Sequence, residues 1–245
     1  MAEIKFDQFV SGLDEYSVKA RLRPALLIAL PLLFATLSLF PAGITGLSTI
    51  VSLFVWAGAS ILLSQMGREW GKRKEPGLYA DWGGQPSIRM LRHRDAANKR
   101  ILARYHAKLE RLIPDVRIPT AEMEKDDPKG ADDVYDACCA FLRAKTRDRK
   151  VFPLIFEENV NYGFRRNLWG MRPLGIIASL SGIVVIGTVV IVHYISDPSI
   201  PRLLCLYGII DALLLLSWLL VFNKAWVKTA ADAYASRLLE GCEIL

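Results

Sequence analysis

The sequence predicts an all-α integral membrane protein, in which two transmembrane helical hairpins (four spans) flank an inserted cytosolic helical domain. Four apolar runs, almost free of charge, are each close to the roughly 20 residues that a helix needs to cross a ~30 Å hydrocarbon core. The runs cover residues 24–40, 47–65, 174–195 and 203–222. They are paired by short turns, and the polar segment between the pairs is too small to bury all four in a soluble core.

The two pairs of runs divide the chain into five parts. These are an interfacial amphipathic segment (1–23), the first transmembrane hairpin (24–65), the cytosolic helical domain (66–172), the second transmembrane hairpin (173–223) and a cytosolic C-terminal helix (224–245).

Basic residues next to the predicted spans indicate the topology. Arg68, Lys72, Arg73 and Lys74 follow the second run, whereas the turn at 41–46 has no charge. Lysine and arginine near span ends face the cytosol, so both termini and residues 66–172 are expected in the cytosol, at an inner or plasma membrane. The same four side chains are predicted to contact anionic lipid head groups. This placement explains the net charge of +6 without nucleic acid as a partner.

Helical spacing predicts the remaining elements. Phe6, Phe9, Val10 and Leu13 fall on one face of an amphipathic helix that would lie at the membrane interface. In the middle segment we expect a turn at 83–86, a helix capped by Ser87 over 87–113, an acidic connector over 115–128, and helices over 132–146 and 154–168. The last span is expected to continue without a break into a helix over 224–240.

Asp211 lies near the centre of the fourth predicted span. A carboxylate at that depth costs about 2.5 to 3.5 kcal/mol on insertion scales, so it should face a partner, a cavity or a pore. One interpretation is an ion or proton site. The other is a protonated carboxyl that hydrogen bonds to Ser181 or Thr188 of a facing helix and holds the spans together. Because no second carboxylate, lysine or arginine lies in the spans, the second interpretation is favoured.

The densest polar and aromatic cluster of the chain precedes the third span, at residues 157–169. Its arginines either anchor the helix at the membrane interface or bind a phosphate or carboxylate, which guanidinium groups hold through paired hydrogen bonds. The anchoring role is favoured. The candidate ligand or lipid site comprises Arg92, Arg94, Arg147, Glu157, Asn161, Arg165, Arg166 and Trp169.

Metal and cofactor sites are not predicted. Aspartates at 126–136 suit the first turn of a helix and pairing with the basic residues of the same domain. Cys138 and Cys139 are expected in a core, and His93 and His106 in solvent, because their spacing does not match a zinc site. The last four residues fit a prenylation motif at Cys242, and whether that thiol is lipidated stays open.

The chain contains no P-loop, GxGxxG, GxSxG or HExxH motif, which favours a non-enzymatic function. The first hypothesis is a membrane effector or scaffold, used in stress or defence, whose cytosolic domain senses or docks a ligand or a protein partner and is coupled to the transmembrane bundle. The alternatives are an ion or proton channel or transporter that uses Asp211, and a membrane enzyme that acts on lipid phosphates. Small-residue faces on the spans favour a homo-oligomer.

Overall fold

The computed structural model describes residues 15–40, 47–199 and 201–245, and this part of the chain consists of helices without a strand. The chain divides into two compact units. The span unit comprises Met1–Lys74 and Gly163–Trp226, and the polar unit comprises Glu75–Tyr162 and Val227–Leu245. The all-helical prediction is confirmed for the described part. Three helices contribute residues to both units: α4 (Leu47–Asp81), α9 (Pro153–Gly170) and α12 (Lys224–Glu240).

Within the described part, three helices are long and apolar enough to cross a membrane, which supports a membrane protein. The first combines α2 (Glu15–Ser17), a π-helix η1 (Val18–Leu22) and α3 (Arg23–Leu39). The second is α10 (Arg172–Ser196), and the third combines α11 (Arg202–Leu216) with a second π-helix, η2 (Ser217–Val221). The fourth predicted span, 47–65, belongs to α4 and stays a prediction. Most of the predicted amphipathic segment, including its apolar positions from Phe6 to Leu13, lies outside the described residues.

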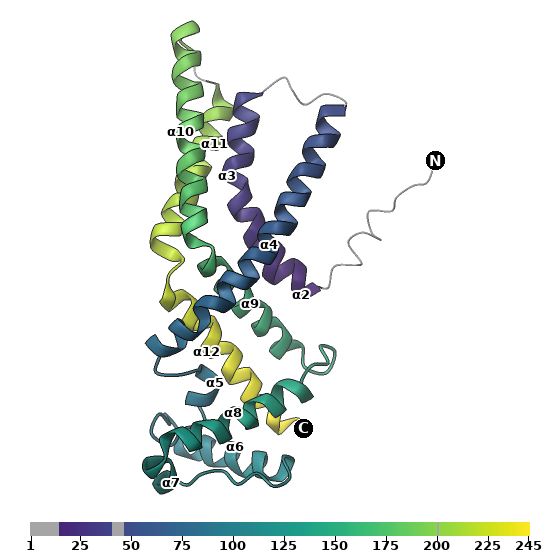
Figure 1. Cartoon of the computed structure of the whole chain (residues 1–245), viewed down its shortest axis with the longest axis vertical. Coiled ribbons are helices and arrows are strands. Elements are labelled where there is room, and N and C mark those ends of the chain that lie inside the picture. The colour runs from purple at the N-terminus through teal and green to yellow at the C-terminus, as the bar shows by residue number, and fades with distance from the viewer. Residues whose placement is uncertain (1–14, 41–46, 200) are drawn as a thin grey trace, which may run out of the picture. The chain divides into compact units, whose positions relative to one another are not determined.

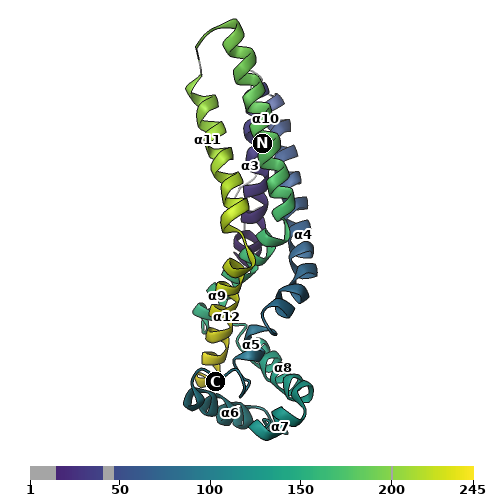
Figure 2. The same ribbon diagram turned by 90° about the vertical axis from the view of Figure 1, so that its left-hand side faces the viewer.

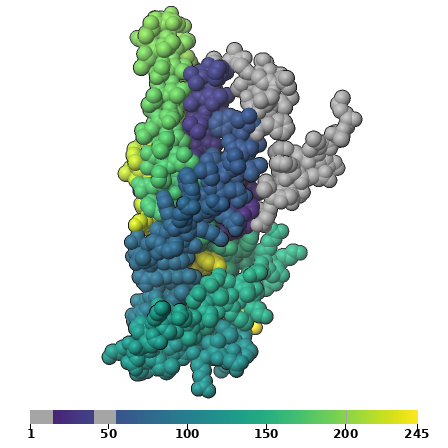
Figure 3. Space-filling model, in the orientation of Figure 1, coloured from purple at the N-terminus to yellow at the C-terminus, as the bar shows by residue number. Residues whose placement is uncertain are grey.

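Helix α10 packs against both α3 and α11 (Figures 1 and 2). Figure 3 shows α10 in green directly beside α3 in purple. The packing face of α10 consists of small side chains, Gly175, Ala178, Ser179 and Gly182, all of which are buried. On this span the small-residue face that the sequence predicts is therefore buried within the chain. Helices in lipid gain van der Waals contact where small residues let their backbones approach.

Helices α4 and α9 cross where two glycines face one another. A Cβ atom on Gly170 would lie 2.5 Å from the main-chain nitrogen of Gly71 and 2.8 Å from its Cα. One turn along α4, a Cβ on Gly67 would overlap the side chain of Met171. The crossing therefore requires glycine at Gly170, because the atoms that a side chain would meet belong to the backbone and cannot rotate away.

The last span does not continue smoothly into the C-terminal helix, so that prediction is wrong. The chain leaves helical geometry at Phe222, where φ is −79° and ψ is 75°, and α12 starts again two residues later. The side chain of Asn223 explains the restart, because its Oδ1 accepts a hydrogen bond of 2.9 Å from the main-chain N–H of Trp226. An asparagine that caps a helix in this way starts a new helix without proline or glycine.

The predicted turn at 83–86 is confirmed. Gly83 and Gly84 both have positive φ, 77° and 129°, a backbone conformation that glycine adopts without strain. The N–H of Gly84 donates to the carbonyl of Tyr79 at 2.7 Å and closes the end of α4. This pattern of a positive φ and a backward hydrogen bond is a common helix ending.

The single helix predicted over 87–113 is wrong. The polar unit contains a short α5 (Pro86–Arg89), an irregular segment, and then α6 (Lys99–Leu112). Asn98, rather than Ser87, caps the long helix, since its Oδ1 accepts hydrogen bonds from Arg100 and Ile101. The predicted acidic connector contains a short helix, α7 (Ala121–Asp126), and the next helix, α8 (Pro128–Lys145), begins before the predicted start at 132.

The core of the polar unit is formed by α6, α8, the polar-unit parts of α9 and α12 and the short η3 (Gly241–Glu243), and α5 packs against it. Its fully buried side chains include Leu109, Tyr135, Leu142 and Leu238. Cys138 and Cys139 belong to the same core, which confirms the prediction for both thiols. Burial raises the pKa of Cys138 to about 11 and that of Cys139 to about 12, so neither thiol is ionised near neutral pH.

We predict that Gly170→Ala lowers the stability of the span unit by about 1 to 3 kcal/mol, because the added methyl group meets the backbone of α4. Thermal unfolding of the full chain in detergent, followed by tryptophan fluorescence, measures the change. Gly58→Ala is the matched control, since a Cβ on Gly58 has no atom within 4 Å among the described residues. Equal stability of the two variants would contradict the close crossing.

Candidate functional site

Asp211 is fully buried between three helices of the span unit. A Cβ atom on Gly182 of α10 would overlap Oδ2 of Asp211, and it would lie 3.1 Å from the Cβ of Pro31 in α3. The carboxyl group therefore occupies the space that the missing side chain of Gly182 leaves open. Among the described residues, neither oxygen of Asp211 has a hydrogen-bond partner.

The expected hydrogen bond from Asp211 to Ser181 or Thr188 is wrong. Both of these side chains are exposed, and the hydroxyl of Thr188 donates to the carbonyl of Val184 in its own helix. Asp211 instead meets α10 at Gly182, which lies on a different face of that helix from Ser181 and Thr188. A residue without a side chain gives no sign in the sequence that it faces a carboxylate.

Two more polar groups are buried without a hydrogen-bond partner among the described residues of this interface. They are the hydroxyl of Ser179 and the indole N–H of Trp218. Ser179 lies about one turn from Gly182 on the buried face of α10, and Trp218 packs against Gly175. Trp218 is also seven residues after Asp211, which places both on one face of the last span. These groups and the carboxyl form a buried polar line through the interface of α10.

A second set of functional candidates gathers aromatic rings and basic side chains in the span unit. We call it the aromatic-cationic cluster, and it comprises Trp169, Trp218, Phe222, Trp226, Lys74, Arg165 and Arg172. The ammonium of Lys74 lies 5.6 Å from the centroid of the Trp169 ring, and the guanidinium of Arg172 lies 5.3 Å from it. Arg165 lies 4.7 Å from the centroid of Trp226. Such pairs are typical of the interface between membrane and water.

The basic residues of this cluster bind main-chain carbonyls at helix ends. Arg172 donates from Nε to the carbonyl of Trp218 at 2.8 Å and from Nη2 to that of Leu219 at 3.0 Å. These carbonyls end a helix and lack intrahelical partners, and a positive charge there is favourable. Arg165 donates to the carbonyl of Trp226 at 2.9 Å, and this carbonyl lies in the first turn of α12.

Lys74 donates to the carbonyl of Gly170 at 3.0 Å. Partial desolvation of its ammonium group lowers the pKa of Lys74, and the nearby charge of Arg172 lowers it further. Of the four residues predicted to meet anionic lipid, Lys72, Arg73 and Lys74 are exposed and Arg68 is half-buried. This exposure is compatible with the lipid contact, which stays a prediction.

The eight residues of the predicted ligand site are divided between the two units. Arg165, Arg166 and Trp169 belong to the span unit, and the other five, Arg92, Arg94, Arg147, Glu157 and Asn161, belong to the polar unit. Arg166 is buried and Trp169 is half-buried, whereas Arg147 and Glu157 are exposed. Asn161 donates to Glu158 at 3.4 Å. Neither unit by itself brings all eight side chains together, and their role as one site stays a prediction.

Arg92 and Arg94 belong to a buried ionic network in the polar unit. Arg92 holds Asp132 through two hydrogen bonds of 2.7 and 2.6 Å, and it also donates to the carbonyl of Gly83 at 2.7 Å. Arg94 reaches Asp132 at 3.3 Å and Glu124 at 3.2 Å. Both arginines therefore pair with carboxylates of the same domain. The sequence predicts this pairing of acidic and basic residues.

Glu124 is the centre of this network and is 2% exposed. Its carboxylate accepts hydrogen bonds from the N–H of His93 at 2.7 Å, the N–H of Arg94 at 3.3 Å and the hydroxyl of Tyr135 at 2.9 Å. Burial raises the pKa of Glu124, but these hydrogen bonds outweigh burial and hold the pKa below its ordinary value. The bonds also explain the irregular segment before α6, because the two amides bind a carboxylate instead of continuing a helix.

His106 is buried, so the prediction of a solvated histidine is wrong at this position. Its Nε2 lies 2.8 Å from the carbonyl of Leu91, and its ring stacks on Tyr135 with centroids 5.8 Å apart. Burial lowers the pKa of His106 more than the hydrogen bond to Leu91 raises it. The sequence signal was present, since His106 and Leu109 share one face of α6 at a spacing of three residues.

Cys242 is buried in the core of the polar unit, where burial raises the pKa of its thiol to about 11. A prenyl group on this sulfur would have to displace the core side chains around it. In the folded polar unit the thiol of Cys242 is therefore free but not accessible for lipidation.

Comparison of the chain with protein-family models, with curated proteins and with solved structures found no match.

We predict that acid loosens the polar unit first around His106. The pKa of this histidine is lower in the folded state than in the unfolded chain. Stability therefore falls as the pH drops below about 6.5, where the unfolded chain takes up the proton, until the pH reaches the folded pKa. Glu124 adds a further loss at lower pH, as the solution passes through its own depressed pKa.

Hydrogen exchange of the full chain at about pH 7.5 and about pH 5.5, corrected for the intrinsic rates, measures this loss in α6 and α8. His106→Gln keeps a donor for the carbonyl of Leu91 without the charge change, and it is expected to remove most of the pH dependence. His193→Gln, in the span unit, is the control. An unchanged pH dependence in His106→Gln would assign the effect to other groups.

Proposed function

We propose that this is a non-enzymatic membrane protein whose polar unit docks a ligand or a protein partner in the cytosol and acts on the transmembrane bundle. In this proposal residues 47–65 form the fourth span, and both termini and residues 66–172 lie in the cytosol. The basic residues that flank the spans support this topology. The proposed setting is a membrane effector or scaffold in an inner or plasma membrane, with anionic lipid and further copies of the chain as partners.

The observation that carries the proposal is the continuity of three helices across the boundary between the units. The boundary falls at Lys74 in α4, at Tyr162 in α9 and at Trp226 in α12, and each position lies inside a helix. A flexible linker would let one unit move without the other. Helical connections instead pass a rotation or shift of one unit to the helices of the other.

The chemistry of the polar unit supports docking rather than catalysis. The carboxylates of Glu124 and Asp132 are bound by Arg92 and Arg94, and the thiols of the core are protonated near neutral pH. Catalytic groups usually combine a perturbed pKa with access to a cleft. The enzymatic alternative also loses support at Arg165, where the side chain binds a carbonyl of its own chain.

We predict that the two units are coupled. Gly182→Ala perturbs the packing of α10 in the span unit, and it should change hydrogen exchange in α6 and α8 of the polar unit. A Gly-Ser-Gly-Ser insertion between Trp226 and Val227 interrupts α12 at the boundary, and it should reduce this response. The same insertion after Asp197, in the second hairpin turn, is the control that should leave the response intact. Identical exchange of the polar unit in wild type and Gly182→Ala would contradict the coupling.

A second candidate function is proton conduction or proton-coupled transport through Asp211. The observation that favours it is the burial of both carboxyl oxygens without a hydrogen-bond partner among the described residues. Ionisable residues inside a membrane are rare, and they often mark ion or proton pathways. The carboxyl fills the space beside Gly182, so no room is left there for a metal cation unless α10 and α11 move apart. A proton can bind the carboxyl without such a movement.

We predict for this second function that Asp211→Asn abolishes proton flux. The amide keeps the size of the carboxyl group and cannot exchange a proton in the same way. Flux is measured with a pH-sensitive dye inside proteoliposomes under an imposed potential. Asp197→Asn, in the exposed hairpin turn, is the matched control and should retain the flux. Wild-type vesicles without flux, or full flux in Asp211→Asn, would exclude this candidate function.

A further inference from the structure

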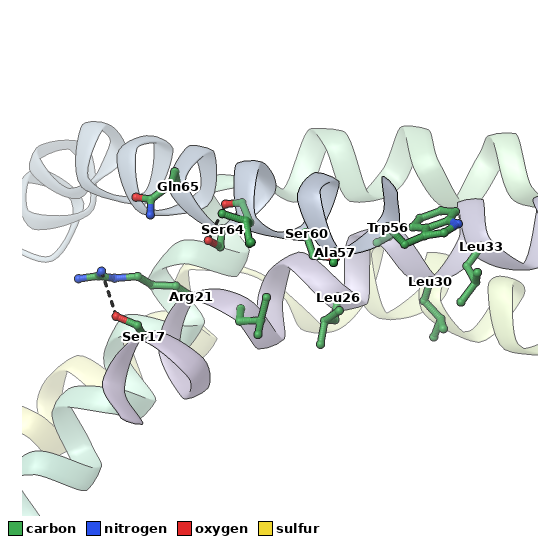
Figure 4. A pocket seen from close by; sticks show the side chains of 13 residues that line it. Ser17, Arg21, Leu26, Leu30, Leu33, Trp56, Ala57, Ser60, Ser64 and Gln65 are labelled. Atoms are coloured by element: carbon green, nitrogen blue, oxygen red, sulfur yellow. Dashed lines mark hydrogen bonds between the residues drawn. The ribbon is translucent and has the colours of Figure 1, made fainter. Parts of the chain in front are cut away.

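The span unit contains a groove between α3 and α4, with a volume of about 650 Å³. This volume lies within the range of about 300 to 1,000 Å³ that is usual for small-molecule sites. Its walls come from α2, η1 and α3 on one side and from α4 on the other (Figure 4). The groove is separate from the buried line at Asp211 and from the aromatic-cationic cluster, because it shares no residue with either.

The charge of this groove lies at one end, and beyond that end the α3 wall is apolar, while Ser60 and Ser64 lie in the α4 wall. Ser17, Arg21 and Gln65 lie together at one end, and Leu26, Leu30 and Leu33 follow along the α3 side (Figure 4). From Arg21 to Leu33 the helix rises about 18 Å, at 1.5 Å per residue. One leaflet of the hydrocarbon core is about 15 Å thick, half of ~30 Å. The groove as a whole, from the charge of Arg21 to the last leucine, is therefore about as long as one leaflet is thick.

The polar end of the groove carries a positive charge that no carboxylate of the described residues neutralises. Arg21 donates from Nη1 to the hydroxyl of Ser17 at 3.2 Å, and its guanidinium lies 5.4 Å from the centroid of the Tyr16 ring. Its neighbour Lys19, in contrast, pairs with Glu15 at 2.6 Å. Arg21 is half-exposed and retains N–H donors for a further acceptor. A phosphate group is a suitable acceptor, because a guanidinium binds it through two parallel hydrogen bonds.

We propose that this groove binds an anionic phospholipid, with one acyl chain along the leucines of α3 and the phosphate on Arg21. A soluble anion would use the polar end alone and would leave the apolar walls uncovered. A lipid satisfies both parts of the groove. Its orientation, with the head group near the N-terminal end of the first span, also matches a helix that enters the hydrocarbon at α3. The proposal rests on the part of the first proposed function that makes residues 47–65 a span, and it depends neither on the docking role of the polar unit nor on proton flux through Asp211.

The test measures lipid bound to the purified full chain by native mass spectrometry, with dioleoyl phosphatidylglycerol as the anionic lipid and dioleoyl phosphatidylcholine as the neutral one. Arg21→Gln should lower the affinity for phosphatidylglycerol by about tenfold, since it removes a charge-assisted contact. Arg23→Gln is the matched control, because Arg23 is exposed and does not line the groove. It should change the affinity by less than about twofold.

A second pair of variants tests the apolar part. Ala57→Trp places a large ring in the groove and should reduce binding of both lipids. Val55→Trp is its control, because Val55 is exposed and lies outside the lining. Circular dichroism checks that each variant keeps its helical content, and glycerol phosphate serves as the soluble head-group probe.

Four results would overturn the proposal. Equal losses in Arg21→Gln and Arg23→Gln would show a general effect of surface charge. Full lipid binding in Ala57→Trp would place the acyl chain elsewhere. Displacement of the lipid by glycerol phosphate at similar concentration would identify a soluble anion as the ligand. A change in the mass of the assembly caused by Ala57→Trp would identify a second copy of the chain as the occupant.

Discussion

Close backbone packing at glycine is the constraint on which the span unit depends. Helices in lipid gain no free energy from leaving water, so their association rests on van der Waals contact and on a few polar interactions. The contact is closest where Gly170 meets Gly71, and where Gly175 and Gly182 receive Trp218 and Asp211. At each of these points the partner fills the space of a missing side chain. A methyl group there would push two helices apart.

Two kinds of polar interaction accompany this packing, and they differ in how well they are satisfied. Arg165 and Arg172 donate to main-chain carbonyls and lie over tryptophan rings, and the charge of Arg172 stabilises the carbonyl end of the last span. Asp211 and Ser179 are buried without such partners among the described residues. A polar group that is buried and unpaired lowers stability, and proteins keep such groups where they serve a function. This contrast is why the second functional proposal rests on Asp211 rather than on the arginines.

The polar unit is stabilised in a different way, by a core of apolar side chains beneath a network of charges. Glu124 accepts three hydrogen bonds and connects α7 to α8 and to the irregular segment before α6. Arg92 and Asp132 close the network with paired hydrogen bonds. Because these charged groups bind one another, they stabilise the fold of the unit. A partner would therefore bind elsewhere, on the exposed surface. In the span unit the opposite holds at Arg21, whose charge lies at the end of the apolar groove and has no carboxylate partner among the described residues.

The sequence by itself determined the helical class, the three apolar helices that are long enough to cross a membrane and the small-residue face of α10, because each depends on a local repeat of residue types. Spacing also placed Cys138 and Cys139 in a core and a turn at Gly83. Spacing did not predict the break at Phe222, the interrupted helix before Asn98 or the burial of His106. The break at Phe222 depends on the cap that Asn223 provides, which competes with a continuous helix. The other two features depend on hydrogen bonds to Glu124 and Leu91, which form only in the folded unit. Tertiary structure alone decided that Asp211 faces Gly182 of α10, and that Arg21 has no carboxylate partner among the described residues, because both depend on contacts between segments far apart in the chain.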